Sequence, residues 1–282
     1  MRLLTRQLPE NHNLFLFGDL HIGSTLFHKE GFDKMCEMVN GSYKSCSNNY
    51  GVAHGDLMES IMIDDPRFQP EATRGDPLIQ IEEVVNTLQP IKNRIVVILQ
   101  GNHEQKLWKF GDITKSIARQ INSEYGTYSC HITYTDKNGK VMYKQYATHG
   151  SKGVNSYADD VGRRVANMEL IIKRHMKDKF GDTILCTKGH SHKLLICKPS
   201  EELYLTVNDG GIKQHYRKSK QTDTEIHPDH KWYVNTGSFM RLYGDEDFSG
   251  YAERWELNPN ELGFAIAVVR DGLIQSVDKI VV

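Results

Sequence analysis

The sequence has few features of a secreted or membrane-bound protein. No run of residues approaches the roughly 18 apolar positions that a membrane helix needs, and residues 1–9 lack the apolar stretch of a signal peptide. The cysteines are odd in number and form no Cys-x-x-Cys pair, which disfavours a disulfide framework. They are Cys36, Cys46, Cys130, Cys186 and Cys197. We therefore expect a cytoplasmic protein without a membrane partner.

An excess of either charge is also absent. Lysine and arginine total 35 and aspartate and glutamate 36, so the formal net charge is −1. Any affinity for a polyanion would need a local basic patch or a bound metal. The chain has neither the G-x-x-x-x-G-K-[ST] loop of nucleotide-driven motors nor the G-x-S-x-G elbow of serine hydrolases. These absences disfavour both classes.

Short apolar runs alternate with patterns of helical period, which predicts a layered α/β fold. The expected early strands are 14–17, 50–53, 95–99, 141–148 and 183–187, and the expected helices are 32–39, 78–88 and 158–177. Continuous apolar runs of this length are typical of strands buried on both faces. The last helix has an apolar stripe that we expect in the core: Val161, Val165, Met168, Ile172 and Met176.

The last third of the chain is richer in strand patterns. We expect strands at 204–207, 232–235, 264–269 and 274–281, forming a second sheet, with a polar excursion at 209–229. Because α/β folds of this size are often one domain, residues 1–282 are predicted to form a single domain. The sequence leaves open whether the chain forms a homodimer.

Polar residues gather where the five early strands end. Each end has a glycine beside Asp, Asn or His, as in Gly18-Asp19, Gly55-Asp56 and Gly101-Asn102. Ligands of open α/β sheets bind beyond the carboxyl ends of strands, and glycine there permits tight turns. We therefore expect two aspartates, one asparagine and at least four histidines to converge in one crevice.

This collection of side chains is typical of a metal site. Imidazole and carboxylate groups suit Zn, Fe, Mn, Co or Ni. Seven ligands are too many for one tetrahedral ion but fit two ions that share a bridging ligand. Two metals roughly 3.5–4 Å apart are a recurrent device for in-line displacement at phosphorus. The residues alone therefore predict metal-assisted phosphoryl hydrolysis.

Five sequence blocks resemble the signature of calcineurin-like metallophosphoesterases and occur in that family's order. They are Gly18-Asp19-Leu20-His21, Gly55-Asp56, Gly101-Asn102-His103-Glu104, His149-Gly150 and Gly189-His190-Ser191-His192. Asn235-Thr236-Gly237-Ser238 is similar to a turn that often follows the last block, and the layout is closest to small prokaryotic and phage phosphoesterases. The resemblance implies a four-layer α-β-β-α sandwich, with two mixed sheets flanked by helices and a dinuclear site at the carboxyl edge of the strands.

The resemblance also implies a role for each matching residue. The first metal would be bound by Asp19, His21 and His192, the second by Asn102, His149 and His190, and Asp56 would bridge both. The cofactors would be two divalent transition-metal ions, with Mn expected and Fe, Zn, Ni or Co as alternatives. A metal-bridging hydroxide would attack the phosphorus. His103 would stabilise the transition state and protonate the leaving oxygen.

Glu59 is a further candidate catalytic residue, three positions after Asp56. In the protein-phosphatase branch of the family an Asp at this offset orients the catalytic histidine, and in the DNA-repair nuclease branch the position holds a His. We hypothesise that the Glu59 carboxylate pairs with His103 and raises the pKa of that histidine, so that it stays a proton donor at neutral pH.

The substrate class is less constrained than the reaction. The protein-phosphatase branch has Asp-Arg-Gly near this point, whereas this chain has Glu59-Ser60-Ile61 and lacks the arginine that grips a phosphomonoester. The expected substrate is therefore a phosphodiester of nucleic acid or nucleotides, and a phosphomonoester is the alternative. A basic run with one aromatic residue is compatible with nucleic acid: Lys213, His215, Tyr216, Arg217, Lys218 and Lys220.

A third alternative is a binding module that keeps the fold without the chemistry. Such a module would show substituted metal ligands. This chain retains all seven implied ligands and His103, which favours an enzyme.

Overall fold

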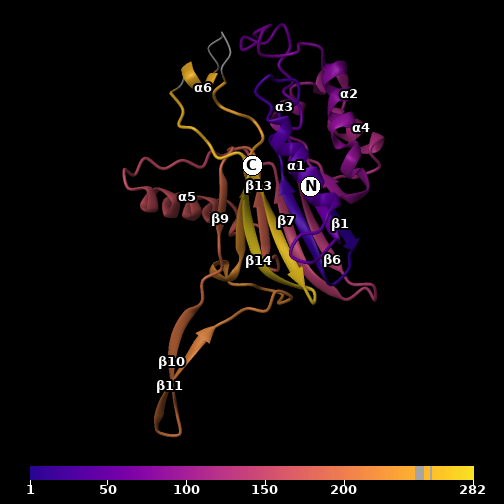
Figure 1. The fold of residues 1–282 in the computed structure, drawn as a ribbon. Coiled ribbons are helices and arrows are strands. Elements are labelled where there is room, and N and C mark those ends of the chain that lie inside the picture. Colours follow the sequence, from indigo (N-terminus) through magenta and orange to yellow (C-terminus); the bar gives the residue numbers. More distant parts are fainter. Residues whose placement is uncertain (245–250, 255) are drawn as a thin grey trace.

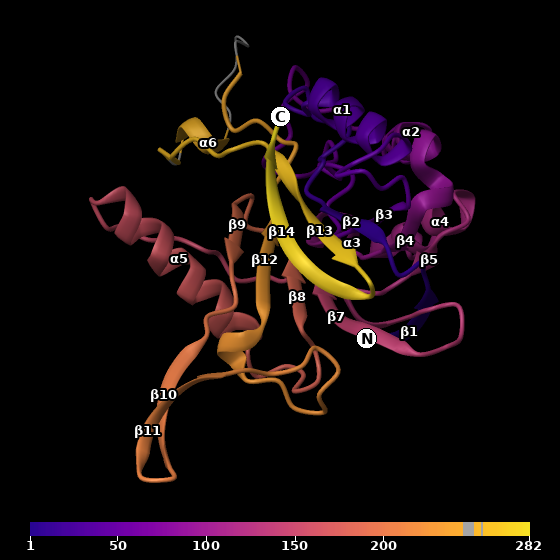
Figure 2. The same cartoon turned by 60° about the horizontal axis from the view of Figure 1, so that its bottom comes forward.

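The structure is a computed structural model that describes residues 1–244, 251–254 and 256–282. It is a mixed α/β protein with two six-stranded mixed sheets (Figures 1 and 2). The first sheet has the order β1 (Arg2–Gln7), β6 (Ser129–Thr135), β7 (Val141–Thr148), β8 (Leu185–Lys188), β12 (Trp232–Thr236) and β9 (Leu194–Cys197). The second has the order β14 (Leu273–Val281), β13 (Gly263–Arg270), β2 (His12–Phe17), β3 (Asn49–Ala53), β4 (Ile95–Ile98) and β5 (Glu124–Tyr125). The predicted α/β class with two mixed sheets is confirmed.

The parallel strands of each sheet decide where the polar loops lie. In the second sheet β2, β3 and β4 run parallel to one another. In the first sheet β7, β8 and β12 do the same. Because carboxyl ends of parallel strands lie at one edge, the loops that leave β2, β3 and β4 are neighbours, as are those that leave β7 and β8.

The core between the two sheets explains the continuous apolar runs. Leu14 and Val52 of the second sheet belong to the same buried cluster as Ile132 and Val234 of the first. On the other face of β2, Phe15 and its neighbours pack with three helices: α1 (Lys29–Asn40), α2 (Pro77–Leu88) and α4 (Ile113–Gln120). Strands that are buried on both faces need apolar side chains at every position.

Helix α5 (Val161–Met176) covers the first sheet only in part. Ile172 and Met176 are buried against Tyr146 of β7, but Val161 is 62% exposed and Val165 37%. The amino-terminal half of the helix extends past β9 in Figure 1. The predicted core stripe is therefore correct for the carboxyl-terminal half of α5 and wrong for its first turns.

A β-hairpin projects away from both sheets (Figure 1). Strand β10 (Glu202–Asn208) pairs in antiparallel fashion with β11 (Gly211–Arg217) as a separate two-stranded sheet. Two expectations are corrected here, because 204–207 does not join a main sheet and 209–229 is not simply a loop. The other late strands are divided between the sheets, with β12 in the first and β13 and β14 in the second.

The remaining elements are short. They are α3 (Asn102–Gln105), α6 (Tyr251–Arg254) and the 3₁₀ turns η1 (Gln89–Arg94), η2 (Trp108–Phe110) and η3 (Pro228–His230). Among the described residues, no helix combines the length and apolar character needed to cross a membrane. The single domain over residues 1–282 stays a prediction.

Candidate metal centre

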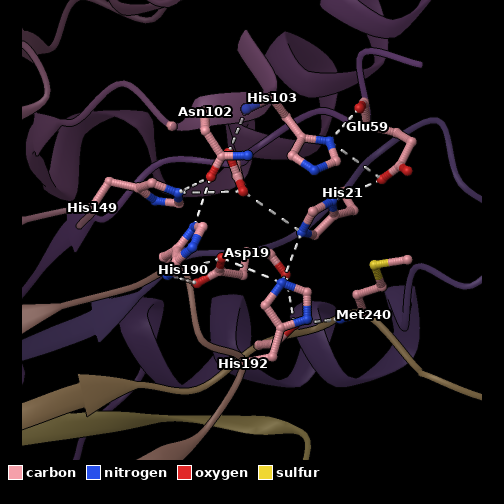
Figure 3. Close-up of polar contacts among 12 residues, drawn as sticks. Asp19, His21, Glu59, Asn102, His103, His149, His190, His192 and Met240 are labelled. Carbon is pink, nitrogen blue, oxygen red and sulfur yellow. Dashed lines mark hydrogen bonds and ion pairs between the residues drawn. The ribbon is translucent and has the colours of Figure 1, made fainter. Parts of the chain in front are cut away.

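All seven predicted ligands lie in one cluster where the loops after five strands meet (Figure 3). The loops after β2, β3 and β4 supply the ligands from the second sheet, and those after β7 and β8 supply the ligands from the first. They are Asp19, His21, Asp56, Asn102, His149, His190 and His192. The convergence expected from the strand ends therefore exists in the structure.

One half of the cluster consists of Asp19, His21 and His192. The Nε2 atoms of His21 and His192 are 3.1 Å apart, and His192 Nε2 is 3.5 Å from Asp19 Oδ1. One ligand atom from each of the three residues lies within 4.8 Å of the others. Two imidazoles and a carboxylate at this spacing suit a borderline transition-metal ion.

The other half consists of Asn102, His149 and His190. The amide oxygen of Asn102 is 2.9 Å from His149 Nε2 and 2.7 Å from His190 Nδ1. Asp56 lies between the halves, with Oδ2 3.3 Å from His149 Nε2 and 4.0 Å from His21 Nε2. The Asp56 carboxylate is therefore the group that can serve both halves.

Several of these residues have an unusual backbone conformation. The φ angles of Asp19, His21, Asp56, His190 and His192 are 52°, 53°, 48°, 73° and 51°. Positive φ is uncommon for residues other than glycine, and such strain clusters at functional sites. The loops after β2, β3 and β8 are thus held in conformations that local preference disfavours.

Glu104 stabilises the loop that carries Asp56, a role not predicted from the sequence. Its buried carboxylate accepts hydrogen bonds from the backbone N–H groups of Gly101 and Asp56 through Oε2, and of Leu57 and Met58 through Oε1. These bonds connect the loop after β3 to the start of α3. The only sequence signal was the position of Glu104 at the end of the Gly-Asn-His-Glu block.

The hypothesised Glu59–His103 pair is present at ion-pair distance, with His103 Nδ1 3.8 Å from Glu59 Oε2. The closer partner of the carboxylate is His21, whose Nδ1 is 2.7 Å from the same oxygen. His103 Nδ1 donates to the backbone carbonyl of Glu59 (Figure 3). Glu59 therefore occupies the position of a carboxylate that orients a metal-binding histidine.

The pKa of His103 differs from the hypothesis, which expected it to be raised. Burial, and next the nearby His21, lower the pKa of His103 to about 4. Because Nδ1 carries the hydrogen that is donated to the Glu59 carbonyl, neutral His103 has its lone pair on Nε2. Burial also disfavours the charged form of His21, but the charge and hydrogen bond of Glu59 outweigh it and raise the pKa of His21 to about 9.

The buried carboxylates indicate a centre that attracts cations. Burial raises the pKa of Asp19 to about 7, and the negative charge of Asp56 adds to this effect against the opposing charge of His149. Burial acts on Asp56 in the same direction, but His149 outweighs it and holds the pKa of Asp56 well below its ordinary value. Burial makes the ionised form of a carboxylate costly, and a bound cation stabilises that ionised form.

A backbone carbonyl group orients the His149 ring. Its Nδ1 lies 2.6 Å from the carbonyl oxygen of His54, so Nε2 faces Asn102. The His54 ring is buried away from the cluster and bonds Thr187 Oγ1 at 2.7 Å. His54 is therefore a structural histidine.

A pocket of about 240 Å³ opens directly over the cluster. Ligand residues, Glu59 and His103 form part of its lining. The rest of the wall comes from Ser24, Leu26, Ile61, Arg67, Gln69, Ala72, Thr73 and Met240. Arg67 was not identified from the sequence.

The basic run at 213–220 lies far from this pocket in the fold, on and after the projecting hairpin. Two of its charges are offset locally, because Arg217 is 3.7 Å from Glu202 and Lys218 is 3.5 Å from Glu201.

Comparison of the chain with protein-family models and with curated proteins finds no match.

Proposed function

We propose that the protein is a metal-dependent phosphoester hydrolase of the calcineurin-like type, with the four-layer α-β-β-α fold. The observation that carries this proposal is the arrangement of two ligand groups around Asp56. One group is Asp19, His21 and His192, and the other is Asn102, His149 and His190. The buried clusters are chemically suited to metal ions.

The donor set fits two divalent transition-metal ions, with Mn²⁺ the expected identity. One ion would be held by each group, and Asp56 would contact both. When bound, such a pair polarises a phosphoryl group and lowers the pKa of a water molecule toward about 7. Glu59 and the His54 carbonyl support the fit, because they orient His21 and His149 as outer partners of metal-binding histidines do.

His103 is proposed to act on the substrate from the pocket wall. The Glu59 carbonyl fixes the ring through Nδ1, which leaves Nε2 as the atom for the reacting phosphoester. Neutral Nε2 accepts hydrogen bonds, so His103 must first bind a proton there before it can protonate a leaving oxygen. The Glu59 carboxylate, 3.8 Å from Nδ1, favours the protonated form, whereas burial opposes it.

One panel of assays tests the proposal. Hydrolysis of p-nitrophenyl phosphate, bis-p-nitrophenyl phosphate, single-stranded DNA and RNA is measured with Mn²⁺, Zn²⁺, Ni²⁺ and Co²⁺, and metal binding is measured by calorimetry. We expect two equivalents of Mn²⁺ to bind and at least one ester to be cleaved. The Asn102→Ala variant should lose at least the 10- to 100-fold that loss of an outer partner costs, which excludes a contaminating activity.

Two results would contradict the proposal. A protein that binds no metal and cleaves no ester would remove both the cofactor and the reaction. Binding of two equivalents without hydrolysis of any ester would favour the binding module instead.

A further inference from the structure

Residues 61–76 form a wall of the pocket between β3 and α2, and the chain fastens this wall at several points. The backbone N–H of Thr25 donates to the Ala72 carbonyl at 2.9 Å, and that of Arg74 donates to the Gly23 carbonyl at 2.9 Å. At the start of the segment, the N–H of Ser60 donates to Gln80 Oε1 at 2.9 Å. The wall therefore has a defined position over the metal cluster.

Arg67 is the cation that this wall presents to the pocket. Its Nε and Nη2 atoms both donate to the carboxylate of Asp65, the first at 2.9 Å. Within residues 1–244, 251–254 and 256–282, Nη1 donates no hydrogen bond. The side chain is 50% exposed. Asp65 thus fixes one edge of the guanidinium and leaves a donor for a ligand.

A second basic side chain, Lys106, is close enough to Arg67 to interact with it electrostatically. Lys106 Nζ is buried and has no hydrogen-bond partner among the described residues. It interacts electrostatically with Arg67, Glu59 and Asp65. Because Glu59 is hydrogen-bonded to His21 and Asp65 to Arg67, neither carboxylate is hydrogen-bonded to this ammonium group. Lys106 therefore adds to the attraction of this wall for an anion.

The size of the pocket limits how much of a substrate its walls can contact. At about 240 Å³, it is smaller than the roughly 300–1,000 Å³ of pockets that enclose drug-sized ligands. The predicted ligands line part of that volume, and the pocket is partly open to solvent, so its walls can contact only a compact group beside the phosphate. Apolar side chains face this space: Leu26, Ile61, Ala72 and Met240. The position of Met240 beside His192 is visible in Figure 3.

We propose that the substrate is a phosphomonoester with a compact, mainly apolar organic group, and that Arg67 binds its phosphate. This inference rests on the proposed phosphoester hydrolysis and chooses between its two substrate classes. A monoester carries a charge of about −1.5 to −2 at pH 7, whereas a diester carries one charge. The extra charge favours a guanidinium that can hydrogen-bond phosphate oxygens. Arg67 thus supplies, from a later loop, the arginine that is absent after Glu59.

The test compares Arg67→Met with Arg74→Met as a matched control. Arg74 forms an ion pair with Glu83 and does not line the pocket. Binding of inorganic phosphate to the Mn²⁺-loaded proteins is measured by calorimetry, and kcat/KM is measured for p-nitrophenyl phosphate and bis-p-nitrophenyl phosphate. Metal stoichiometry and circular dichroism establish that each variant is folded.

We expect Arg67→Met to bind phosphate about tenfold more weakly and to lose about tenfold in kcat/KM for the monoester, as for one hydrogen bond to a charged group. The loss for the diester should stay below about threefold, and Arg74→Met should match the wild type throughout. Arg67→Lys should give an intermediate phosphate affinity, because it keeps the charge without the planar fork. Phenylphosphonate should bind the wild type more tightly than phosphate does, because its ring contacts the apolar wall.

Wild-type values for Arg67→Met in both assays would overturn the role of Arg67 while leaving the hydrolase proposal intact. Equal losses for monoester and diester, or wild-type preference for the diester, would overturn the substrate class. If phenylphosphonate binds no more tightly than phosphate, the proposal that the substrate carries an apolar organic group would be rejected. Only a wild type that binds no metal and cleaves neither ester would bring down the proposed function itself.

Discussion

Replacement of Glu59 by Gln should weaken metal binding in a manner that depends strongly on pH. Glu59 acts on His21 in two ways through one hydrogen bond of 2.7 Å. It orients the ring toward His192, which favours a metal ion. In the metal-free protein it also raises the pKa of His21 to about 9, so that a proton competes with the metal.

The two effects can be compared in size. At pH 7 a pKa of about 9 for His21 means that displacing the proton costs about 2.7 kcal/mol, or about 100-fold in affinity. Loss of an orienting partner typically costs 10- to 100-fold in affinity. Glu59→Gln removes the negative charge that holds the proton and weakens the orienting hydrogen bond, because an amide oxygen accepts less strongly than a carboxylate. The two terms therefore oppose each other at pH 7. Near pH 9 the proton no longer competes, and only the weaker orientation remains.

We therefore expect the Mn²⁺ affinity of the wild type to exceed that of Glu59→Gln by about 10- to 100-fold at pH 9 and by only a few-fold at pH 7. Competition calorimetry at the two pH values measures this ratio. His149, whose pKa is also raised to about 9, affects both proteins equally and cancels. Glu83→Gln, which alters a glutamate paired with Arg74 at the surface, is the control. An affinity ratio that is the same at both pH values would refute the reasoning.

Three further predictions concern stability. Glu104→Gln should lower the free energy of unfolding in urea by at least about 2 kcal/mol, because one of its two ends becomes an NH2 group that cannot accept the backbone N–H groups bound by that carboxylate oxygen. With EDTA, the melting temperature should fall from pH 6.5 to pH 8: the raised pKa values of His21 and His149 give stability that is present below pH 6.5 and lost toward pH 9. With saturating Mn²⁺ this fall should disappear, because proton competition for the ligands decreases. Deletion of residues 202–217 should change unfolding free energy by about 0.5 kcal/mol or less and leave Mn²⁺ binding intact, because the hairpin joins neither main sheet.

The positions of the seven predicted ligands could be inferred because each follows from a local pattern. A buried apolar run predicts a strand, and the polar residue after it must lie at the end of that strand. The arrangement in space then follows from the parallel order of β2, β3 and β4 and of β7 and β8. The hydrogen-bond partner of Glu59 could not be predicted, because the choice depends on about one ångström: the carboxylate is 2.7 Å from His21 and 3.8 Å from His103.

The other incorrect or missing predictions concern features that the periodicity of the sequence does not specify. The apolar stripe of α5 indicates which face can pack but not where the sheet beneath it ends, so Ile172 is buried while Val161 is exposed. The alternation at 204–207 indicates a strand but not which sheet accepts it, and β10 finds only β11. Arg67 lies in a stretch without secondary-structure period, and only the folding of residues 61–76 over the cluster brings it to the pocket.

The glycines of the signature blocks have a physical explanation in the same cluster. A Cβ on Gly101 would lie 2.0 Å from Asp56 Oδ1, and one on Gly189 would lie 2.9 Å from Asp19 Oδ2. These glycines are required because carboxylates occupy the space of their side chains. Asp19 and Asp56 themselves have positive φ, a strain of about 1–3 kcal/mol each. Contacts such as those of Glu104 with the Asp56 loop offset that strain, so the glycine, the strained ligand and its buried support form one structural unit.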